Sequence, residues 1–504
     1  MSASSDAADL ARFGYRAQLA RRLGSFSAFA AGFSYLSILT GIFQMFHVGF
    51  GAVGPVCFWT WPAVFAGQLC VALCLAELAA QYPLAGGLYQ WARLSSGDSL
   101  GRIVGGLYLA CLVVTLAAVP LAWQTTLPQL WSGFRLLGPA EDERAAAANA
   151  VLLGCALIGL SWVVNAVGVR LLAWINNAGV FAELLGALAL VGLLGMRAAH
   201  SPAILLQRFG HGVAMAQSPF SGFLLAMLMS SYVMFGYDTA GALAEETKDP
   251  RRRVPRAILQ ALTAAAVLGG LLLLVSLRAA PDLQDVRLGN PSFGLPFLLR
   301  QVLGSTTGKF LLADVAFAIA VCTLAVHTGA ARLVFAMARD GSLPAARQLA
   351  KVAPHRQVPQ VAVASVGLLA LVVLLLNIRH PQIVALLTSV AVIWANLSYL
   401  LVTGPQLWRR LRNPMSSPET ASPGFSLGRA GLPINLLAVI FGIGICVNIG
   451  WPRAAVYGSG WAQRFAALYL TGGVLLLCGI ALLVSGPKGS QTAVDSASPA
   501  PESS

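Results

Sequence analysis

One acidic residue stands in an apolar stretch where a charged group is costly. In 235-FGYDTAG-241, Asp238 follows a glycine that lies between two aromatic residues, and arginines occupy positions 251–253. An ionisable group at the centre of a bilayer costs at least ~2.5 kcal/mol, and a glycine inside a helix costs about 1 kcal/mol relative to alanine. Such residues occur together where they line a polar cavity, so the stretch predicts a membrane helix that is interrupted to hold a small solute.

The side chains of this stretch have the chemistry to bind an amine. An aromatic face of Phe235 or Tyr237 attracts an ammonium group, and the acid can pair with an amine or with a basic side chain. The alternatives are ordinary aromatic packing and an acid that only supports the architecture. We predict that the solute site includes Phe235, Gly236, Tyr237 and Asp238.

A second interruption is predicted in 32-GFSYLSILTGIF-43, where hydroxyl residues and two glycines replace the leucines of a simple anchor. The first turn of a half-helix has backbone N–H groups without partners and a positive dipole end. Thr40, Gly41 and Ile42 would therefore present donors to a carboxylate, with Ser37 beside them. The alternative is a glycine notch that lets two helices pack closely.

Two further ionisable residues lie deep in apolar runs. Glu183 is near the middle of 171-LLAWINNAGVFAELLGALAL-190, where a carboxyl group could carry a proton or bond a neighbouring helix. His327 lies too deep in its run to be an interfacial anchor. It could relay a proton or be a core histidine with both nitrogens bonded.

Charged residues also gather at predicted helix ends on one side of the membrane: Glu77, Glu245, Glu246 and Arg332. Mutual salt bridges among them would form a gate, and the alternative is that they fix loops to helices. The eight cysteines show no metal-ligand spacing. With no Walker A sequence and no catalytic triad pattern, the sequence predicts neither an enzyme nor an ATP-driven pump, and no metal or cofactor.

Composition places the chain in a membrane. Hydrophobic residues make up 57% of it and charged residues 10%, and its mean hydropathy is +0.74, which is outside the range of soluble proteins. The net charge of +14 is spread in short clusters, so no basic domain exists for nucleic acid. The predicted partners are the lipid bilayer, a small solute and a co-transported proton.

Twelve apolar runs are long enough to cross a bilayer as helices. They are centred on 26–46, 56–77, 103–123, 149–165, 171–195, 218–244, 256–279, 310–335, 360–378, 382–403, 433–451 and 466–485.

Orientation follows from the basic residues. Most of the 33 Lys and Arg residues fall in the connections on the side of the N-terminal tail, which predicts that both termini are cytoplasmic. We predict a plasma-membrane protein, or an inner-membrane protein in a bacterium, with a cytoplasmic tail at 1–25 and a disordered tail at 487–504.

The two interruptions lie five spans apart, in helices of opposite direction. This spacing is typical of two inverted five-helix repeats, predicted over 26–195 and 218–403, with additional helices at 433–485. The fold class expected is an all-α membrane transporter fold with twelve spans, of which the first and sixth are broken.

Three long segments carry a family resemblance: 76-AELAAQYPLAGGLYQWA-92, 235-FGYDTAGALAEETKDPRRRVPRAI-258 and 331-ARLVFAMARDGSLP-344. In sequence and order they resemble the motifs of the amino acid/polyamine/organocation permease superfamily, over most of the chain. Three more segments are most similar to its amino acid/choline transporter branch, which includes GABA permeases: 35-YLSILTGIFQMFHVGFG-51, 57-CFWTWPAVFAGQL-69 and 425-FSLGRAGLPIN-435.

The resemblance implies a secondary transporter for an amino acid or related amine. It implies that an acid at the position of Asp238 supports the architecture, and that proton-coupled relatives often carry a lysine where this chain has Glu183. Leu39 replaces a glycine that cradles the substrate carboxylate in relatives, which favours GABA-like ω-amino acids or amines without a carboxylate. The alternatives are an exchanger of amino acids, choline or polyamines with the same fold, and a nutrient sensor that does not transport.

Overall fold

The computed structural model describes residues 11, 13–15, 19, 21, 23–138, 142–209, 218–353, 356–378, 383–412 and 424–485. The predicted C-terminal tail and most of the predicted N-terminal tail lie outside the described residues. Within the described part the regular structure is helical apart from one isolated bridge between Leu23 and Thr247. This confirms the predicted all-α fold class.

Every predicted span has a helical counterpart. Nine helical stretches in the described part are long and apolar enough to cross a membrane, and the first, Ser25–Gln81, contains two predicted spans. The shorter apolar helices Phe220–Val233 and Gln360–Leu375 correspond to the sixth and ninth spans. Twelve crossings are therefore accounted for.

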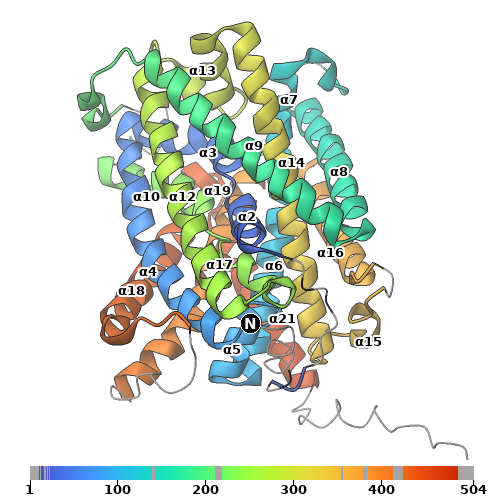
Figure 1. The fold of residues 1–504 in the computed structure, drawn as a ribbon. Coiled ribbons are helices and arrows are strands. Elements are labelled where there is room, and N and C mark those ends of the chain that lie inside the picture. Colours follow the sequence, from blue (N-terminus) through green and yellow to red (C-terminus); the bar gives the residue numbers. More distant parts are fainter. Residues whose placement is uncertain are drawn as a thin grey trace, which may run out of the picture.

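The spans correspond in order to these helices: α2 (Ser25–Leu36) with α3 (Ile38–Val53), α4 (Thr60–Gln81), α6 (Asp98–Ala118), α8 (Glu143–Val167), α9 (Val169–Met196), α10 (Pro219–Val233) with α11 (Thr239–Ala242), α12 (Pro250–Ala279), α14 (Ser305–Arg339), α16 (Gln360–Leu375), α17 (Ile383–Arg412), α18 (Gly431–Gly450) and α21 (Ala466–Ser485). Shorter helices lie between them: α5 (Leu88–Ser96), α7 (Ala122–Leu130), α13 (Gly294–Leu303), α15 (Ala346–Leu349), α19 (Ala454–Tyr457) and α20 (Trp461–Arg464). Figure 1 shows the spans side by side, with α9 crossing in front of α2 and α14.

Both predicted interruptions are present. Ser37 separates α2 from α3 with a φ of 31°, a conformation that a non-glycine residue rarely adopts. In the sixth span, α10 ends at Val233 and α11 begins at Thr239, and Gly236 in the gap has a φ of 96°. A glycine carries no Cβ penalty there, which explains its place in the motif.

The two broken spans pack against each other. α3 contacts α10, and α2 contacts α11. A methyl group added at Gly32 would lie 3.2 Å from the Tyr237 carbonyl oxygen, and one added at Gly236 would lie 1.9 Å from the Tyr35 ring. Glycines thus allow the two interruptions to meet.

Spans one to five and six to ten make corresponding contacts, in which each span of the first half is matched by the span five positions later. α4 packs on α12, α6 on α14 and α8 on α16, which pairs spans two, three and four with seven, eight and nine. The contact of α2 with α12 has a counterpart in α10 with α4, and that of α9 with α14 in α17 with α6. This pattern agrees with two related halves, whose boundaries stay a prediction.

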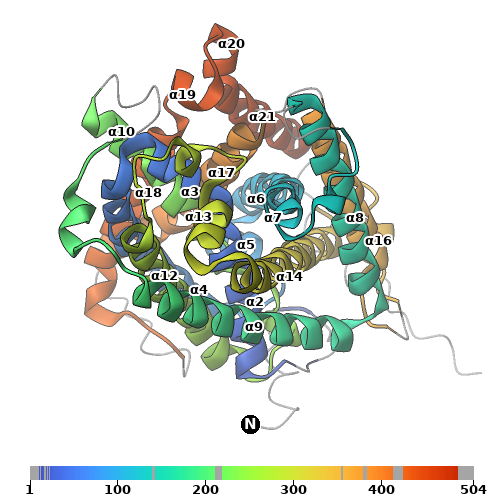
Figure 2. The same cartoon turned by 90° about the horizontal axis from the view of Figure 1, so that it is seen from above.

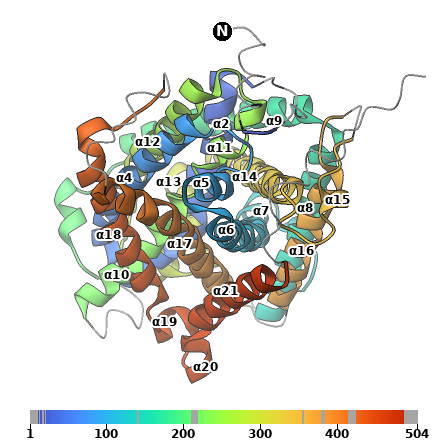
Figure 3. The same cartoon turned by 90° about the horizontal axis from the view of Figure 1, so that it is seen from below.

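The last two spans lie at the edge of the bundle. Seen from above and from below, α18 and α21 are outside the ring of the other spans (Figures 2 and 3). α18 packs on α17 and α4, and α21 packs on α6 and α17. Most of their apolar surface is exposed, as expected for helices that face lipid.

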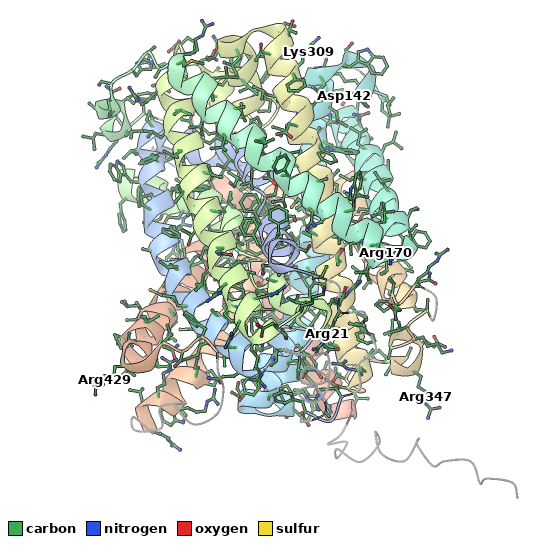
Figure 4. The ribbon with its side chains drawn as sticks, viewed as in Figure 1. Arg21, Asp142, Arg170, Lys309, Arg347 and Arg429 are labelled. Atoms are coloured by element: carbon green, nitrogen blue, oxygen red, sulfur yellow. The ribbon has the colours of Figure 1, made fainter. Side chains whose placement is uncertain are left out.

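The labelled charged residues lie at different heights of the bundle. In Figure 4, Arg21, Arg347 and Arg429 lie toward the lower end, Arg170 lies at about mid-height, and Lys309 and Asp142 lie at the upper end. We use "lower end" for the end that carries α5 and α15 in Figure 1. The sequence predicts that this end faces the cytoplasm.

Candidate functional site

The interruption at Ser37 is held by an acid from another span. The Ser37 hydroxyl donates to Glu183 Oε1 over 2.9 Å, and the Leu39 backbone N–H donates to the same oxygen over 3.1 Å. Glu183 comes from α9 and is 1% exposed. Its carboxyl group therefore lies at the positive end of α3, where the dipole favours negative charge.

The break lies at Ser37, so the backbone N–H groups without helical partners differ from those that the sequence analysis predicted. Because α3 begins at Ile38, the Gly41 N–H bonds the Ser37 carbonyl oxygen over 2.9 Å, and Ile42 follows in the continuous helix. The Thr40 N–H points to Ser37 Oγ over 3.4 Å. The prediction that Gly41 presents a free donor is wrong, since the open first turn lies nearer to Leu39.

Gly41 has a packing role instead. A methyl group added there would lie 2.7 Å from Val233 Cγ2 of α10. The glycine is thus the notch at which the upper halves of the two broken spans touch. This was the alternative that the sequence left open for it.

Asp238 lies at the second interruption and is bonded by two tyrosines. Tyr108 of α6 and Tyr399 of α17 each donate to Asp238 Oδ1, over 2.7 and 2.6 Å. The Gly236 N–H donates to the same Tyr399 hydroxyl over 2.9 Å. Asp238 is 2% exposed. It joins the broken span to the third and tenth spans, as the family resemblance implies for an acid at this position.

Aromatic rings fill the space between the two interruptions. Phe235 lies edge-on to Tyr35, with 5.8 Å between the ring centroids, and to Tyr232 over 5.9 Å. Tyr237 stacks on Tyr399 over 5.5 Å, and its hydroxyl donates to Gln68 Oε1 over 2.9 Å. All of these rings are buried.

His327 is bonded within the core of the bundle. Its Nε2 lies 2.9 Å from the Val363 carbonyl oxygen on α16, and its Nδ1 lies 3.0 Å from the Ser161 hydroxyl on α8. A neutral ring with the proton on Nε2 satisfies both contacts. The ring thus faces α8 and α16, while Glu183 meets α14 from the side of α9.

Two buried salt bridges lie below the breaks. Arg332 Nε of α14 lies 2.8 Å from Glu246 Oε1, and both side chains are nearly inaccessible. Next to them Arg339 pairs with Glu245 over 2.8 Å, and Glu245 also accepts from the Ala85 N–H over 3.0 Å. These pairs join the loop after the second break to α14 and to the loop before α5.

Glu77 is separate from these pairs, contrary to the predicted gathering of four charged residues. It pairs with Arg410 of α17, accepts from Gln406 over 3.0 Å, and accepts from the Leu427 N–H over 3.1 Å. The reason is that α4 packs against α17 and α18 at its lower end. Glu77 therefore fixes α4 to the tenth span and to the segment before α18.

Comparison with known proteins decides the family. A model described as amino acid permease matches residues 23–476. The chain belongs to the amino acid permease family.

Named relatives of the permease agree with this. The chain is 27% identical to amino-acid permease BAT1 of Arabidopsis thaliana, with 88% of each chain covered. It is 23% identical to the GABA-specific permease of Saccharomyces cerevisiae, over 94% of this chain and 82% of that one. It is 28% identical to the methylthioribose transporter of Bacillus subtilis, over 68% and 72%. The permease is a multi-pass membrane transporter of the amino acid type, and not an enzyme.

A small cavity with a mixed polar and apolar lining lies in the permease next to Glu246. It measures about 30 Å³, which is room for one or two water molecules. Its polar lining residues include Asn176 and Asn177 of α9, Thr239 of α11, Thr328 of α14, and Glu246, beside apolar side chains such as Leu172 and Leu243. Among the described residues, no group of three or more His, Cys, Asp or Glu is placed to hold a metal ion.

Several residues of the permease site escaped the sequence analysis: Gln68, Tyr35, Tyr108 and Tyr399. Each is a polar or ionisable side chain in an apolar run. An isolated polar residue in an apolar span can be recognised in the sequence as a candidate site residue, because a polar side chain among apolar residues needs a partner inside the bundle. The partner itself comes from another span, and one sequence does not reveal it.

Proposed function

We propose that this permease is a secondary active transporter that takes up a small amino acid or related amine such as GABA together with a proton. The solute would bind between the interruptions at Ser37 and Gly236 and be exposed to the two sides in turn. The observation that carries this proposal is the contact of Glu183 with Ser37 and Leu39, which puts a buried carboxyl group at the break.

Glu183 is the group we propose to carry the proton. While ionised, its carboxylate fits the positive end of α3 and holds two donors there. Protonation removes that charge and weakens both hydrogen bonds. The Leu39 N–H would then become available to the solute, so binding of a proton and binding of the solute support each other.

The class of solute is proposed from the residues around the breaks. The aromatic side chains Tyr35, Phe235 and Tyr237 suit an ammonium group. A carboxylate on the solute would share the first turn of α3 with Glu183, which favours a flexible ω-amino acid. The name of the GABA-specific relative in yeast supports GABA as the first solute to test, and the name of the methylthioribose transporter advises testing other solutes too.

Alternating access would require the lower end to open. The Arg332–Glu246 and Arg339–Glu245 pairs join α14 to the loop after α11, and Glu246 also lines the small cavity. Opening would separate the loop after α11 from α14. The charged pairs would then act as the gate, with Glu77 as a fixed brace.

The test is uptake of labelled GABA into proteoliposomes, with and without an inward proton gradient. Unlabelled α-amino acids, polyamines and choline serve as competitors. Uptake stimulated by the gradient is the expected result. Flux that depends only on solute inside the vesicle would indicate the exchanger instead. The absence of flux for every solute, with binding retained, would indicate the sensor.

A further inference from the structure

A second acid lies on the same helix interface as Glu183. Asp314 of α14 faces Gly186 of α9 so closely that a methyl group added at Gly186 would lie 1.7 Å from Asp314 Oδ2. Gly186 follows Glu183 by three residues, which places the two on one face of α9, about one helical turn apart. The glycine therefore makes room for the aspartate beside Glu183.

Each of the two carboxyl groups has one buried oxygen without a hydrogen-bond partner among the described residues. Glu183 Oε2 and Asp314 Oδ2 are both buried, and neither accepts a hydrogen bond from any described residue. No described basic side chain forms an ion pair with Asp314. A buried carboxylate oxygen without a donor is costly, whereas a proton moving between the two groups would use both oxygens.

The surroundings of the pair contain few other titratable groups. On the α14 side, the titratable groups that interact electrostatically with Glu183 are Asp314 and Cys322. On the side of α2 and α3 the groups are the hydroxyls of Ser37 and Thr40, which share a hydrogen bond of 2.6 Å. His327 faces α8 and α16. Among the described residues, Asp314 is the acid that lies against Gly186 on this face of α9.

The directions of α9 and α14 show which of the two acids, Glu183 or Asp314, lies nearer to the upper end of the bundle. α9 rises from Arg170 at about mid-height toward the upper end, so Gly186 lies above Glu183, and α14 descends from Lys309 at the upper end (Figures 1 and 4). Asp314 is five residues below Lys309 in the chain and is partly exposed, whereas Glu183 is fully buried. Asp314 thus lies between Glu183 and the upper end of the bundle.

We propose that Asp314 is the proton donor to Glu183 from the upper side of the membrane. This inference rests on the proposed proton coupling through Glu183. In the step, the proton leaves the Asp314 carboxyl group and binds the Glu183 carboxylate. Asp314 becomes ionised and then takes a proton from water at the upper end.

The first test replaces the acid without changing its size. Asp314→Asn should lower the initial rate of gradient-driven uptake by at least about tenfold, as expected for loss of a proton-transfer group. Exchange of labelled for unlabelled solute at equal pH, which needs no net proton transfer, should stay near the wild-type rate. Asp314→Glu should restore part of the gradient-driven rate. Equal loss of exchange and uptake in Asp314→Asn would show a merely structural residue and overturn the proposal.

The second test displaces the Asp314 side chain without replacing the residue. Gly186→Ala pushes the flexible Asp314 side chain away from α9, while Gly192→Ala on the same helix is the control, because nothing lies within 4 Å of that position. Only Gly186→Ala should slow gradient-driven uptake. Normal coupled uptake in both variants would contradict the relay.

The relay and the coupling site fail in different ways. If Glu183→Gln abolishes the response to the gradient and Asp314→Asn leaves it intact, Glu183 keeps its role and the relay is refuted. If uptake by the Glu183→Gln variant still responds to the proton gradient, both the coupling role of Glu183 and the relay through Asp314 are refuted. Both are also refuted if wild-type uptake does not depend on the gradient.

Discussion

Glu183 accepts a hydrogen bond from Ser37 over 2.9 Å, across 146 positions of the chain. The contact joins the middle of the fifth span to the break of the first. A carboxyl group from the protein thus occupies the helix end at which relatives are expected to bind a substrate carboxylate. This relationship links the charge state of one side chain to the proposed solute site.

Glu183→Gln should uncouple transport from protons. Glutamine keeps the size and can still accept from Ser37, but it cannot bind and release a proton near neutral pH. Wild-type uptake should rise as the pH outside the vesicles is lowered, because protons are then driven inward, and the variant should show a flat profile. The measurement is the initial uptake rate from pH 5 to 8 with a fixed internal pH. A variant profile that still rises in acid would rule out Glu183 as the coupling group.

Tyr399→Phe should destabilise the second break. The change leaves the Gly236 N–H without its acceptor and Asp238 with one donor fewer, and each orphaned buried group costs about 1–3 kcal/mol. Tyr108→Phe removes only one donor and should cost less. Thermal unfolding in detergent measures both effects. Tyr469→Phe on the lipid-facing α21 is the matched control, and a Tm for Tyr399→Phe equal to that of the control would disprove the role.

Arg332→Gln should destabilise the lower end more than the double variant with Glu246→Gln. Removing one partner of a buried ion pair leaves an uncompensated charge and costs about 3–5 kcal/mol, whereas removing both avoids that charge. The comparison is a double-mutant cycle on unfolding in detergent. Arg287→Gln breaks an exposed pair with Asp285 and should cause no measurable change. Additive effects of the two gate substitutions would mean that the residues do not interact.

Gly41→Ala should disturb packing between the broken spans. The added methyl group would meet Val233 at 2.7 Å, and overpacking of this kind costs about 1–3 kcal/mol. Combination with Val233→Ala should recover stability and uptake, because it removes the atoms that clash. Gly444→Ala has open space around it and is the control. If the double variant folds well and still fails in uptake, Gly41 contributes to transport through more than packing.

Much of the fold was predictable because each span carries its own signal. Apolar length gives the helices, and the glycines and polar residues near Ser37 and Gly236 give the interruptions, since both depend on residues close together in the chain. The family followed from long motifs of the same local kind. The small helices α5, α7 and α13 were missed, because they are short segments within connections or at span ends.

The site was only partly predictable because its contacts join distant residues. Glu183 and Asp238 stood out as acids in apolar runs, but the partners Ser37, Tyr108 and Tyr399 come from other spans. Glu77 forms its ion pair with Arg410 because α4 packs on α17. Such choices depend on which helix faces meet.

The sequence by itself determined that this is a helical membrane protein of the permease type with two broken spans, because hydropathy, glycine and basic residues act locally. Only the tertiary structure decided that Glu183 caps α3, that Gly41 packs on Val233, and that Asp314 lies beside Gly186. The physical reason is that hydrogen bonds and steric contacts act over a few ångströms. Residues far apart in the chain meet only once the helices are packed.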